Sequence, residues 1–400
     1  MGALMLAIIY LSFISLGLPD SLIGSGWSVM REELNVPISY AGIVTMIISC
    51  CTIFSSLFSD RLTSKLGTGL VTAISVLLTA VALLGFSLST RFWHLCLWAV
   101  PYGLGAGAVD AALNNYVALH YKSRHMSWLH CFWGFGAMIS PYIMSYALTG
   151  SSGWNGGYRT VSIIQFGLTA ALFLTLKLWK KPQEAAENRG EEGAPKKSRS
   201  LLEIFKIDGV PLVLLSFFAY CAAEATAMLW TSSYLLEYRG LSEQTASRCA
   251  SLFFIGITVG RFLGGFITEK LGDKLLVRIG TAVMLVGVAL VLIPFESNAF
   301  SIVGFVVFGF GCAPVYPCII HSTPERFGED NSQAIIGIQM ASAYTGSTFM
   351  PPVFGLLAQY VDIALLPVYL LLFTVLLLVL TECLNAKMKQ KERAPLEKLS

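Results

Sequence analysis

The stretch FWHLCLWAVPYGLGAGAVDAALNNYVAL, residues 92–119, is long and apolar enough to cross a lipid bilayer, yet it carries one aspartate, Asp110. A membrane-spanning helix needs about 20 mostly apolar residues, because the hydrocarbon core is about 30 Å thick. A charge at the bilayer centre costs about 2.5–3.5 kcal/mol on insertion scales, so it usually faces a cavity or a partner. The stretch therefore predicts a transmembrane helix in which Asp110 has a functional role.

The rest of the chain has the same character. Its 400 residues are 55% hydrophobic and only 13% charged, and the mean hydropathy is +0.68. A soluble domain has about 25% charged residues. We therefore expect an all-α membrane protein with twelve transmembrane helices, in the apolar stretches 3–24, 39–59, 69–89, 93–119, 126–149, 159–180, 209–236, 246–268, 275–295, 299–321, 332–357 and 363–385. The first stretch lacks a basic N-terminal region and a small-residue cleavage site, so we expect a retained helix rather than a signal peptide.

A charged segment near the centre divides the chain into two. The segment KPQEAAENRGEEGAPKKSRSLLEIFK, residues 181–206, combines Pro, Gly and charges of both signs, a composition typical of a flexible linker. We expect a short amphipathic helix at 201–205. The predicted organisation is an N-terminal six-helix bundle at 1–180, a cytoplasmic linker at 181–206, and a C-terminal six-helix bundle with a cytoplasmic tail at 207–400.

The two halves share short patterns in the same order. The pairs are SKLGTGLV (64–71) with EKLGDKLLV (269–277), Gly103-Leu-Gly105 with Gly309-Phe-Gly311, and Gly136–Pro141 with Gly346–Pro351. Their offsets of 205, 206 and 210 residues are nearly constant. The patterns predict a duplicated six-helix unit related by pseudo-two-fold symmetry, an architecture that places a substrate site near the midplane and works by alternating access.

The basic residues indicate the orientation. Most of the 27 Lys and Arg fall on one side if the loops alternate between the two faces of the membrane. The other side receives only Arg31, Arg91, Arg159, Arg239 and Arg248. Because cytoplasmic loops are rich in Lys and Arg, we expect both termini in the cytoplasm and a multi-pass protein of the plasma (inner) membrane. The basic residues mark topology and do not suggest nucleic acid.

The chain resembles the major facilitator superfamily along essentially its whole length, on its predicted helices, central linker and repeated acidic-basic-glycine loops. The loop SDRLTSKLGTG (59–69) is similar to that family's GxxxDRxGRR signature, although Ser56 replaces the leading Gly and the trailing basic pair is missing. The resemblance implies a gating role for Asp60 and Arg61, which latch helix ends together in one conformation.

The face that carries Asp110 points to a site. On a helix of 3.6 residues per turn this face continues with Gly103, Ala106, Gly107 and Asn114. The small residues allow a backbone or a ligand to approach closely. A carboxylate beside a polar cavity can carry a proton or cation and accept from sugar hydroxyls; the alternative is an Asp that only stabilises packing.

Further candidate residues lie on other predicted helices. Asp20 follows Pro19, which interrupts helix hydrogen bonding, and serves coupling unless it lies near the outer interface. Glu224, in YCAAEATAMLWTSSYL, either couples transport or pairs with Arg261, a gating residue. His130 and Trp133 share one helix face, where they either bind a sugar ring or pack against each other. The remaining candidate substrate contacts are Asn115, Trp230 and Gln339.

Three stretches resemble the fucose:proton symporter family and its glucose-transporting relatives. They are LPDSLIGSGW (18–27), GLGAGAVDAALNN (103–115) and LHCFWGFGAMISPY (129–142). Asp20 and Asp110 fall on that family's helix-one and helix-four acids, and Asn114 on the following Asn. His130 and Trp133 depart from the Gln and Asn that are frequent there.

These observations predict a secondary active transporter and no enzyme. HExxH sites, P-loops and serine nucleophile elbows are absent from the sequence. We expect symport of a hexose-like sugar with a cation, the proton preferred over sodium, with coupling by Asp20, Asp110 and Glu224. The alternative is a proton-coupled exporter of drugs or amphipathic metabolites. The expected partners are a small-molecule substrate and membrane lipid, with no cofactor beyond the coupling ion, and the protein is expected to be a monomer.

Overall fold

The computed structural model describes residues 2–37, 40–179, 201–294 and 297–397, and these residues form helices without any β-strand. Residues 181–200 of the expected linker lie outside the described residues, while its last part forms the short helix α9 (Leu201–Phe205). The chain divides into two compact units. Unit 1 comprises Met1–Tyr116 and Trp128–Ser198, and unit 2 comprises Val117–Ser127 and Arg199–Ser400.

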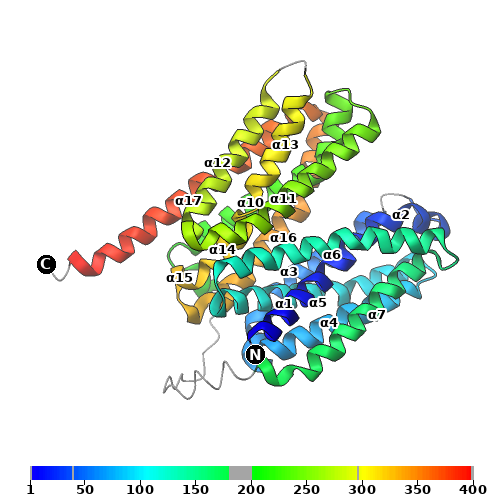
Figure 1. Ribbon diagram of the computed structural model, residues 1–400, viewed down its shortest axis with the longest axis horizontal. Coiled ribbons are helices and arrows are strands. Elements are labelled where there is room, and N and C mark those ends of the chain that lie inside the picture. The colour runs from blue at the N-terminus through cyan, green and yellow to red at the C-terminus, as the bar shows by residue number, and fades with distance from the viewer. Residues whose placement is uncertain (1, 38–39, 180–200, 295–296, 398–400) are drawn as a thin grey trace. The chain divides into compact units, whose positions relative to one another are not determined.

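Unit 1 is a helical bundle in which the first expected span is interrupted (Figure 1). After Pro19, α1 ends at Asp20 and the chain restarts as a new helix at Leu22, so the helix breaks at the predicted position. The helices are α1 (Gly2–Asp20), α2 (Leu22–Glu33), α3 (Tyr40–Leu66), α4 (Thr68–Ser87), α5 (Phe92–His120), α6 (Ser123–Thr149) and α7 (Gly153–Leu174).

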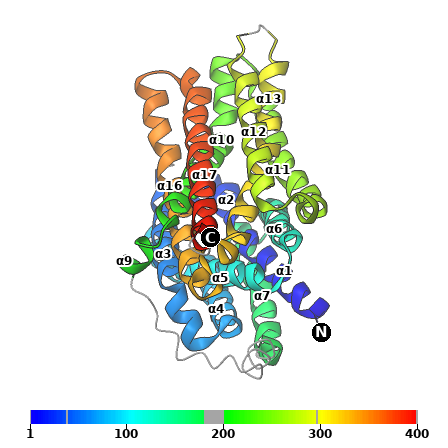
Figure 2. The same cartoon turned by 90° about the vertical axis from the view of Figure 1, so that its left-hand side faces the viewer.

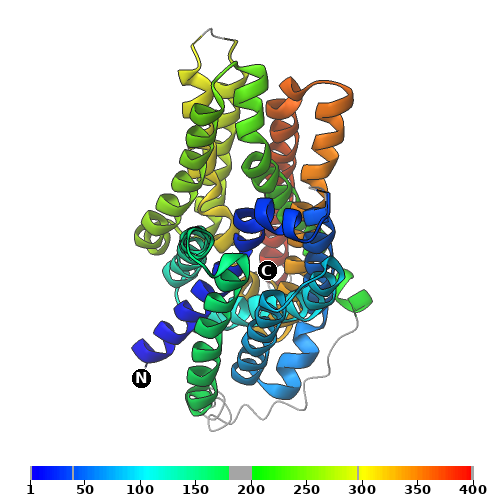
Figure 3. The same ribbon diagram turned by 90° about the vertical axis from the view of Figure 1, so that its right-hand side faces the viewer.

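Unit 2 repeats this plan with more interruptions (Figures 2 and 3). Its elements are α10 (Val210–Ser233), the π-helix η1 (Tyr234–Tyr238), α11 (Glu243–Leu271), α12 (Asp273–Leu292), α13 (Ala299–Cys312), α14 (Val315–His321), α15 (Thr323–Phe327), α16 (Glu329–Tyr360), the 3-10 helix η2 (Ile363–Leu365) and α17 (Leu366–Glu397). Within it, α10 packs against α16 and α17, and α12 packs against α13.

The described residues hold nine segments long and apolar enough to cross a membrane. The other three expected spans form α6, α7 and α16, which carry more polar and small residues. In a helix every interior backbone group is hydrogen-bonded within the segment, which hydrocarbon requires because it offers no other partner. The all-α fold predicted from the sequence is therefore the one observed.

One glycine in each half makes the same turn. Gly67, between α3 and α4, has φ 77° and ψ 154°, and Gly272, between α11 and α12, has φ 75° and ψ 156°. Only glycine readily adopts this region, because a Cβ atom would clash with the backbone. The pattern KLG that is common to the two loops therefore encodes one sharp helix–helix connection, used twice.

The repeated glycines also make equivalent helix contacts. A Cβ atom on Gly105 of α5 would meet the Ser75 carbonyl of α4, and one on Gly311 of α13 would meet the Gly280 carbonyl of α12. The remaining pairs behave alike: Gly103 lies against Ile48 of α3 and Gly309 against Phe253 of α11, while Gly136 lies against Ile14 of α1 and Gly346 against Phe218 of α10. Each shared glycine thus brings two helix backbones together in its own half.

We expect opposite effects from Ala at two glycines. Gly311→Ala places a methyl group 2.5 Å from the Met284 amide nitrogen, and such overpacking costs about 1–3 kcal/mol. Gly167→Ala on α7 meets no atom within 4 Å, and Ala favours the helix by about 0.5–1 kcal/mol over Gly. Thermal unfolding of the purified protein should show a lower midpoint for the first variant and an unchanged or higher one for the second. Equal midpoints would mean that the contact at Gly311 is not tight.

Candidate functional site

Asp20 is held by two aromatic donors in unit 1. The Tyr102 hydroxyl of α5 donates to Asp20 Oδ1 at 3.0 Å, and the Trp133 indole Nε1–H of α6 donates to Oδ2 at 2.9 Å. The helix break after Pro19 places Asp20 at the end of α1. Gly17, whose missing side chain leaves room for the Trp133 carbonyl, brings α1 close to α6. Three helices therefore meet at this carboxylate.

The Asp20 carboxylate retains free acceptor capacity. A carboxylate has about four lone-pair sites, and the Tyr102 and Trp133 hydrogen bonds use two of them. Asp20 is exposed, while Trp133 is half-buried. An exposed acceptor between an indole and a phenol can take hydroxyl hydrogens or a proton, and the indole face can stack on an apolar ring.

A second polar cluster connects α5 and α6 inside unit 1. Asn114 Nδ2 donates to Asp110 Oδ1 at 2.8 Å, and the His130 Nε2 lies 3.1 Å from Asn114 Oδ1. Asp110 is only 7% exposed, and Asn114 is fully buried. The amide thus connects a carboxylate to an imidazole, and such a chain of polar groups can hydrogen-bond a buried solute. Asn115 is buried beside this chain.

The small residues on the Asp110 face are used for helix packing. A Cβ atom on Gly103 would meet the Ile48 carbonyl, and one on Gly107 would meet the Thr52 carbonyl, both on α3. The close approach that the sequence predicts is therefore made by a neighbouring backbone.

Glu224 and Arg261 form an ion pair in unit 2. Arg261 Nη2 donates to Glu224 Oε1 at 3.0 Å, joining α11 to α10. The Arg261 side chain is 6% exposed and the Glu224 side chain is 13% exposed. The Arg261 guanidinium also lies over the Tyr316 ring, 6.0 Å from its centroid. The structure shows the pairing of Glu224 with Arg261, which is one of the two alternatives given for Glu224. The pairing leaves neither buried charge without a counter-charge.

Two other candidate residues make contacts within unit 2. The Trp230 indole donates to the Pro351 carbonyl of α16 at 2.9 Å. Gln339 is fully buried, and its Oε1 accepts from the Thr323 hydroxyl at 3.0 Å. Both side chains therefore join elements of this bundle.

The two acidic-basic-glycine loops differ in their contacts. Arg61 is exposed and lies over the ring of Phe58 on its own helix, and Asp60 is half-buried beside it. In the second loop, Glu269 pairs with Arg124 at 3.0 Å and with Lys122 at 3.5 Å. This second network was not predicted from the sequence, although the repeat of the loop pointed to it.

No group of three or more His, Cys, Asp or Glu side chains is placed to hold a metal ion within the described residues. The polar clusters are instead carboxylates with amide, imidazole, phenol and indole partners. Such groups can donate to and accept from polar solutes.

Two bundles of spanning helices with repeated glycine contacts and buried charges define a polytopic transporter architecture. The family model of the Major Facilitator Superfamily matches residues 9–247 and 212–398. The chain belongs to this superfamily; it is an integral multi-pass membrane transporter and not an enzyme.

Curated relatives are distant and varied in name. The chain is 24% identical to the Bypass of stop codon protein 6 of Saccharomyces cerevisiae, over 89% of this chain and 77% of that one. It is 22% identical to the fosmidomycin resistance protein of Escherichia coli, over 86% and 84%. A glucose/mannose transporter of Bacillus subtilis is 23% identical over half of each chain.

Solved structures share the fold. The E. coli fucose:proton symporter matches with a TM-score of 0.73 at 15% identity, over 96% of this chain and 98% of that one. A proton:xylose symporter matches with a TM-score of 0.78 at 13% identity, over 94% and 93%.

We expect the Glu224–Arg261 pair to be costly to break but not to replace. Glu224→Ala leaves Arg261 buried without its counter-charge, which costs about 3–5 kcal/mol. The double variant Glu224→Leu/Arg261→Met removes both charges and should recover most of the loss. Thermal unfolding of the single, double and parent proteins measures this. A double variant no more stable than Glu224→Ala would contradict the pairing energetics.

Proposed function

We propose that the protein is a symporter that carries a hexose-like sugar together with a proton by alternating access. The observation that carries this proposal is the exposed Asp20 carboxylate between the Tyr102 hydroxyl and the Trp133 indole. A sugar offers hydroxyl hydrogens to an acid and an apolar ring face to an aromatic side chain. Asp20 supplies the acceptor for the hydroxyl hydrogens, and Trp133 supplies the aromatic face for the sugar ring.

Asp110 is the proposed proton carrier. Buried in a membrane protein, a carboxylate is costly when ionised and is neutralised by a proton. Asn114 hydrogen-bonds the carboxylate and His130 hydrogen-bonds Asn114, so both partners hold the carboxylate in a fixed position. With Asp110 protonated, the sugar-loaded carrier reorients without a buried net charge. With Asp110 ionised, the sugar-loaded carrier is held back, so sugar crosses only together with a proton. Asp20 and Glu224 are the further coupling residues of this proposal.

The substrate contacts of the proposal are drawn from both bundles. They are Asn114, Asn115, His130, Trp133, Trp230 and Gln339. The gating residues are Asp60, Arg61 and Arg261, and the bundles are residues 1–180 and 207–400 with the cytoplasmic linker 181–206 between them. The proposed setting is a monomer in the plasma (inner) membrane with both termini cytoplasmic.

The named relatives favour sugar without excluding other cargo. Support comes from the glucose/mannose transporter of Bacillus subtilis, similar over half of the chain. The similarity to the fosmidomycin resistance protein favours the alternative, a proton-coupled exporter of drugs or amphipathic metabolites. A sodium-coupled sugar symporter is the other alternative, because carboxylates and amides are also sodium ligands.

Uptake into proteoliposomes tests the coupling. We expect labelled hexoses to accumulate under an imposed proton gradient and not under a sodium gradient alone. Asp110→Asn should abolish gradient-driven accumulation and keep exchange of internal for external sugar, because the amide cannot carry the proton. Glu32→Gln, at an exposed acid, is the matched control and should behave like the parent.

Either of two results would overturn this reading. If Asp110→Asn keeps full accumulation, Asp110 is not the proton carrier. If no hexose enters under any gradient, the exporter is favoured, and efflux of amphipathic cations becomes the next assay.

Trp133→Phe tests the sugar contact. The variant keeps an aromatic ring and removes the indole N–H that donates to Asp20. Without this donor the Asp20 carboxylate is no longer held in place for a sugar hydroxyl. A hydrogen bond to a charged group is worth about 1.5–3 kcal/mol, so weakening the sugar–Asp20 contact should lower the apparent affinity for sugar roughly ten-fold or more. Trp93→Phe, at an exposed tryptophan of α5, should leave it unchanged. Equal affinities in the two variants would remove Trp133 from the site.

A further inference from the structure

We propose that His321 and Asp273 form a proton-holding latch, which fastens the turn between α5 and α6 to α12 and α14 and opens when its proton is lost. This inference is independent of the cargo proposed above. It rests on the geometry of three residues, His321, Asp273 and Tyr121.

Both ring nitrogens of His321 are engaged. Nε2 lies 3.1 Å from the Tyr121 backbone carbonyl oxygen, and Nδ1 lies 2.6 Å from Asp273 Oδ2. A carbonyl oxygen only accepts hydrogen bonds, so Nε2 must carry a hydrogen. The hydrogen between Nδ1 and Oδ2 is then a second one.

With this second hydrogen, the His321–Asp273 pair holds one proton more than a neutral imidazole beside an ionised carboxylate would hold. Either Nδ1 donates to an ionised Asp273, or a protonated Asp273 donates to Nδ1. Without the proton, a nitrogen lone pair would face a carboxylate oxygen at 2.6 Å, which is repulsive. The latch as observed is therefore the protonated form.

The surroundings favour a proton at this pair. The Ser123 hydroxyl donates to the other oxygen of Asp273, and the Cys318 thiol of α14 also contacts this carboxylate. Glu325 of α15 faces His321, and its negative charge favours a proton there. Arg326 is the charged group that faces Asp273.

The turn contributes further charged groups to the latch. Lys122 and Arg124 are engaged by Glu269 of α11. Burial, together with the Arg124 guanidinium, lowers the pKa of the His125 imidazole. Because its unperturbed value is about 6.5, His125 is neutral at neutral pH, and the titrating histidine of the latch is His321.

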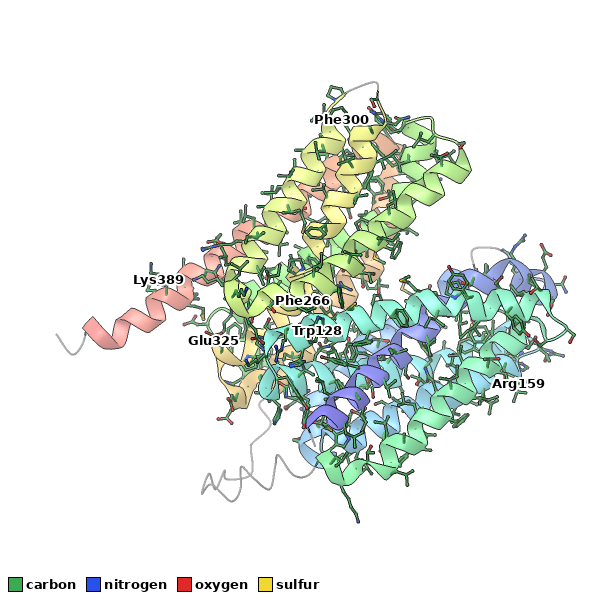
Figure 4. The ribbon with its side chains drawn as sticks, viewed as in Figure 1. Trp128, Arg159, Phe266, Phe300, Glu325 and Lys389 are labelled. Carbon is green, nitrogen blue, oxygen red and sulfur yellow. The ribbon has the colours of Figure 1, made fainter. Side chains whose placement is uncertain are left out.

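The latch has a defined place in the fold. The helices α5 and α6 belong for most of their length to unit 1, whereas their connecting residues Val117–Ser127 are grouped with unit 2. Within unit 2, the labelled Glu325 on α15 and Phe300 on α13 lie at opposite ends (Figure 4). The latch lies at the Glu325 end, which is rich in Lys and Arg and is therefore expected to face the cytoplasm.

The direction of the pH effect follows from the extra proton. The closed latch binds one proton more than the open one, so it is favoured at acidic and neutral pH and weakened as the pH rises. A rise in cytoplasmic pH would release the turn between α5 and α6 and thereby ease any movement in which this turn takes part.

Cys318 provides a reporter inside the latch. It is fully buried, and it becomes accessible to a maleimide only if the surrounding contacts open. The test uses the full chain in detergent micelles with every other cysteine replaced by alanine. Protection is defined at each pH as the labelling rate of the protein denatured in dodecyl sulfate divided by the labelling rate of the folded protein. This ratio corrects for the ionisation of the thiol.

We expect strong protection of Cys318 at pH 6, falling roughly ten-fold per pH unit above the transition, because one proton is released on opening. In His321→Gln, which cannot span both partners, protection should be low at every pH. His94→Gln, at the other end of α5, is the control and should match the parent. Protection that does not change with pH in the parent, or that keeps its pH dependence in His321→Gln, would overturn the proposal.

Asp273→Asn separates the proton from the contact. The Asn amide can donate to Nδ1 of a neutral imidazole while Nε2–H still donates to the Tyr121 carbonyl, so the latch closes without the extra proton. We expect protection to persist and to become independent of pH. This isosteric variant decides the question even if His321→Gln does not fold, since an unchanged pH dependence in Asp273→Asn would also overturn the proposal.

Discussion

The absence of water from the hydrocarbon core is the constraint on which the rest of this structure depends. A polar group placed there must find its partner in the protein. Arg261 and Glu224 do so by pairing with each other across two helices, and Asp110 does so through the amide of Asn114. Asp20, by contrast, is exposed and accepts from the side chains of Tyr102 and Trp133. The carboxylate that is least enclosed is thus the one best placed to meet a solute.

Close helix packing serves the same constraint. Lipid gives no hydrophobic drive for helices to associate, so association relies on van der Waals contact at short backbone distances. The glycines at 105 and 311 permit such contacts in the two halves. The interruption after Pro19 works differently, since it places Asp20 at the end of α1, where Tyr102 and Trp133 donate to its carboxylate.

Local patterns in the sequence predicted much of the fold, because hydrophobic length and glycine spacing act within one helix or one loop. They gave the spans, the break after Pro19 and the short helix at Leu201–Phe205. Partnerships between distant residues were harder. Tyr102 lies 82 residues from Asp20, and His321 lies 200 residues from Tyr121. Nothing in a single sequence specifies which distant side chain a polar residue will meet, so the phenol partner of Asp20 and the network around Glu269 emerged only from the structure.

The two halves share glycines at equivalent positions and differ in their polar residues. At the offsets that align the glycines, Asp110 corresponds to Tyr316 and Arg261 to Ser56. The ring of Tyr316 lies beneath Arg261, whereas Ser56 donates to a backbone carbonyl of its own helix. The two halves therefore share a glycine scaffold and differ in their polar chemistry. For protein engineers this separates two tasks, since polar side chains can be exchanged while the glycines that let the helix backbones approach are left intact.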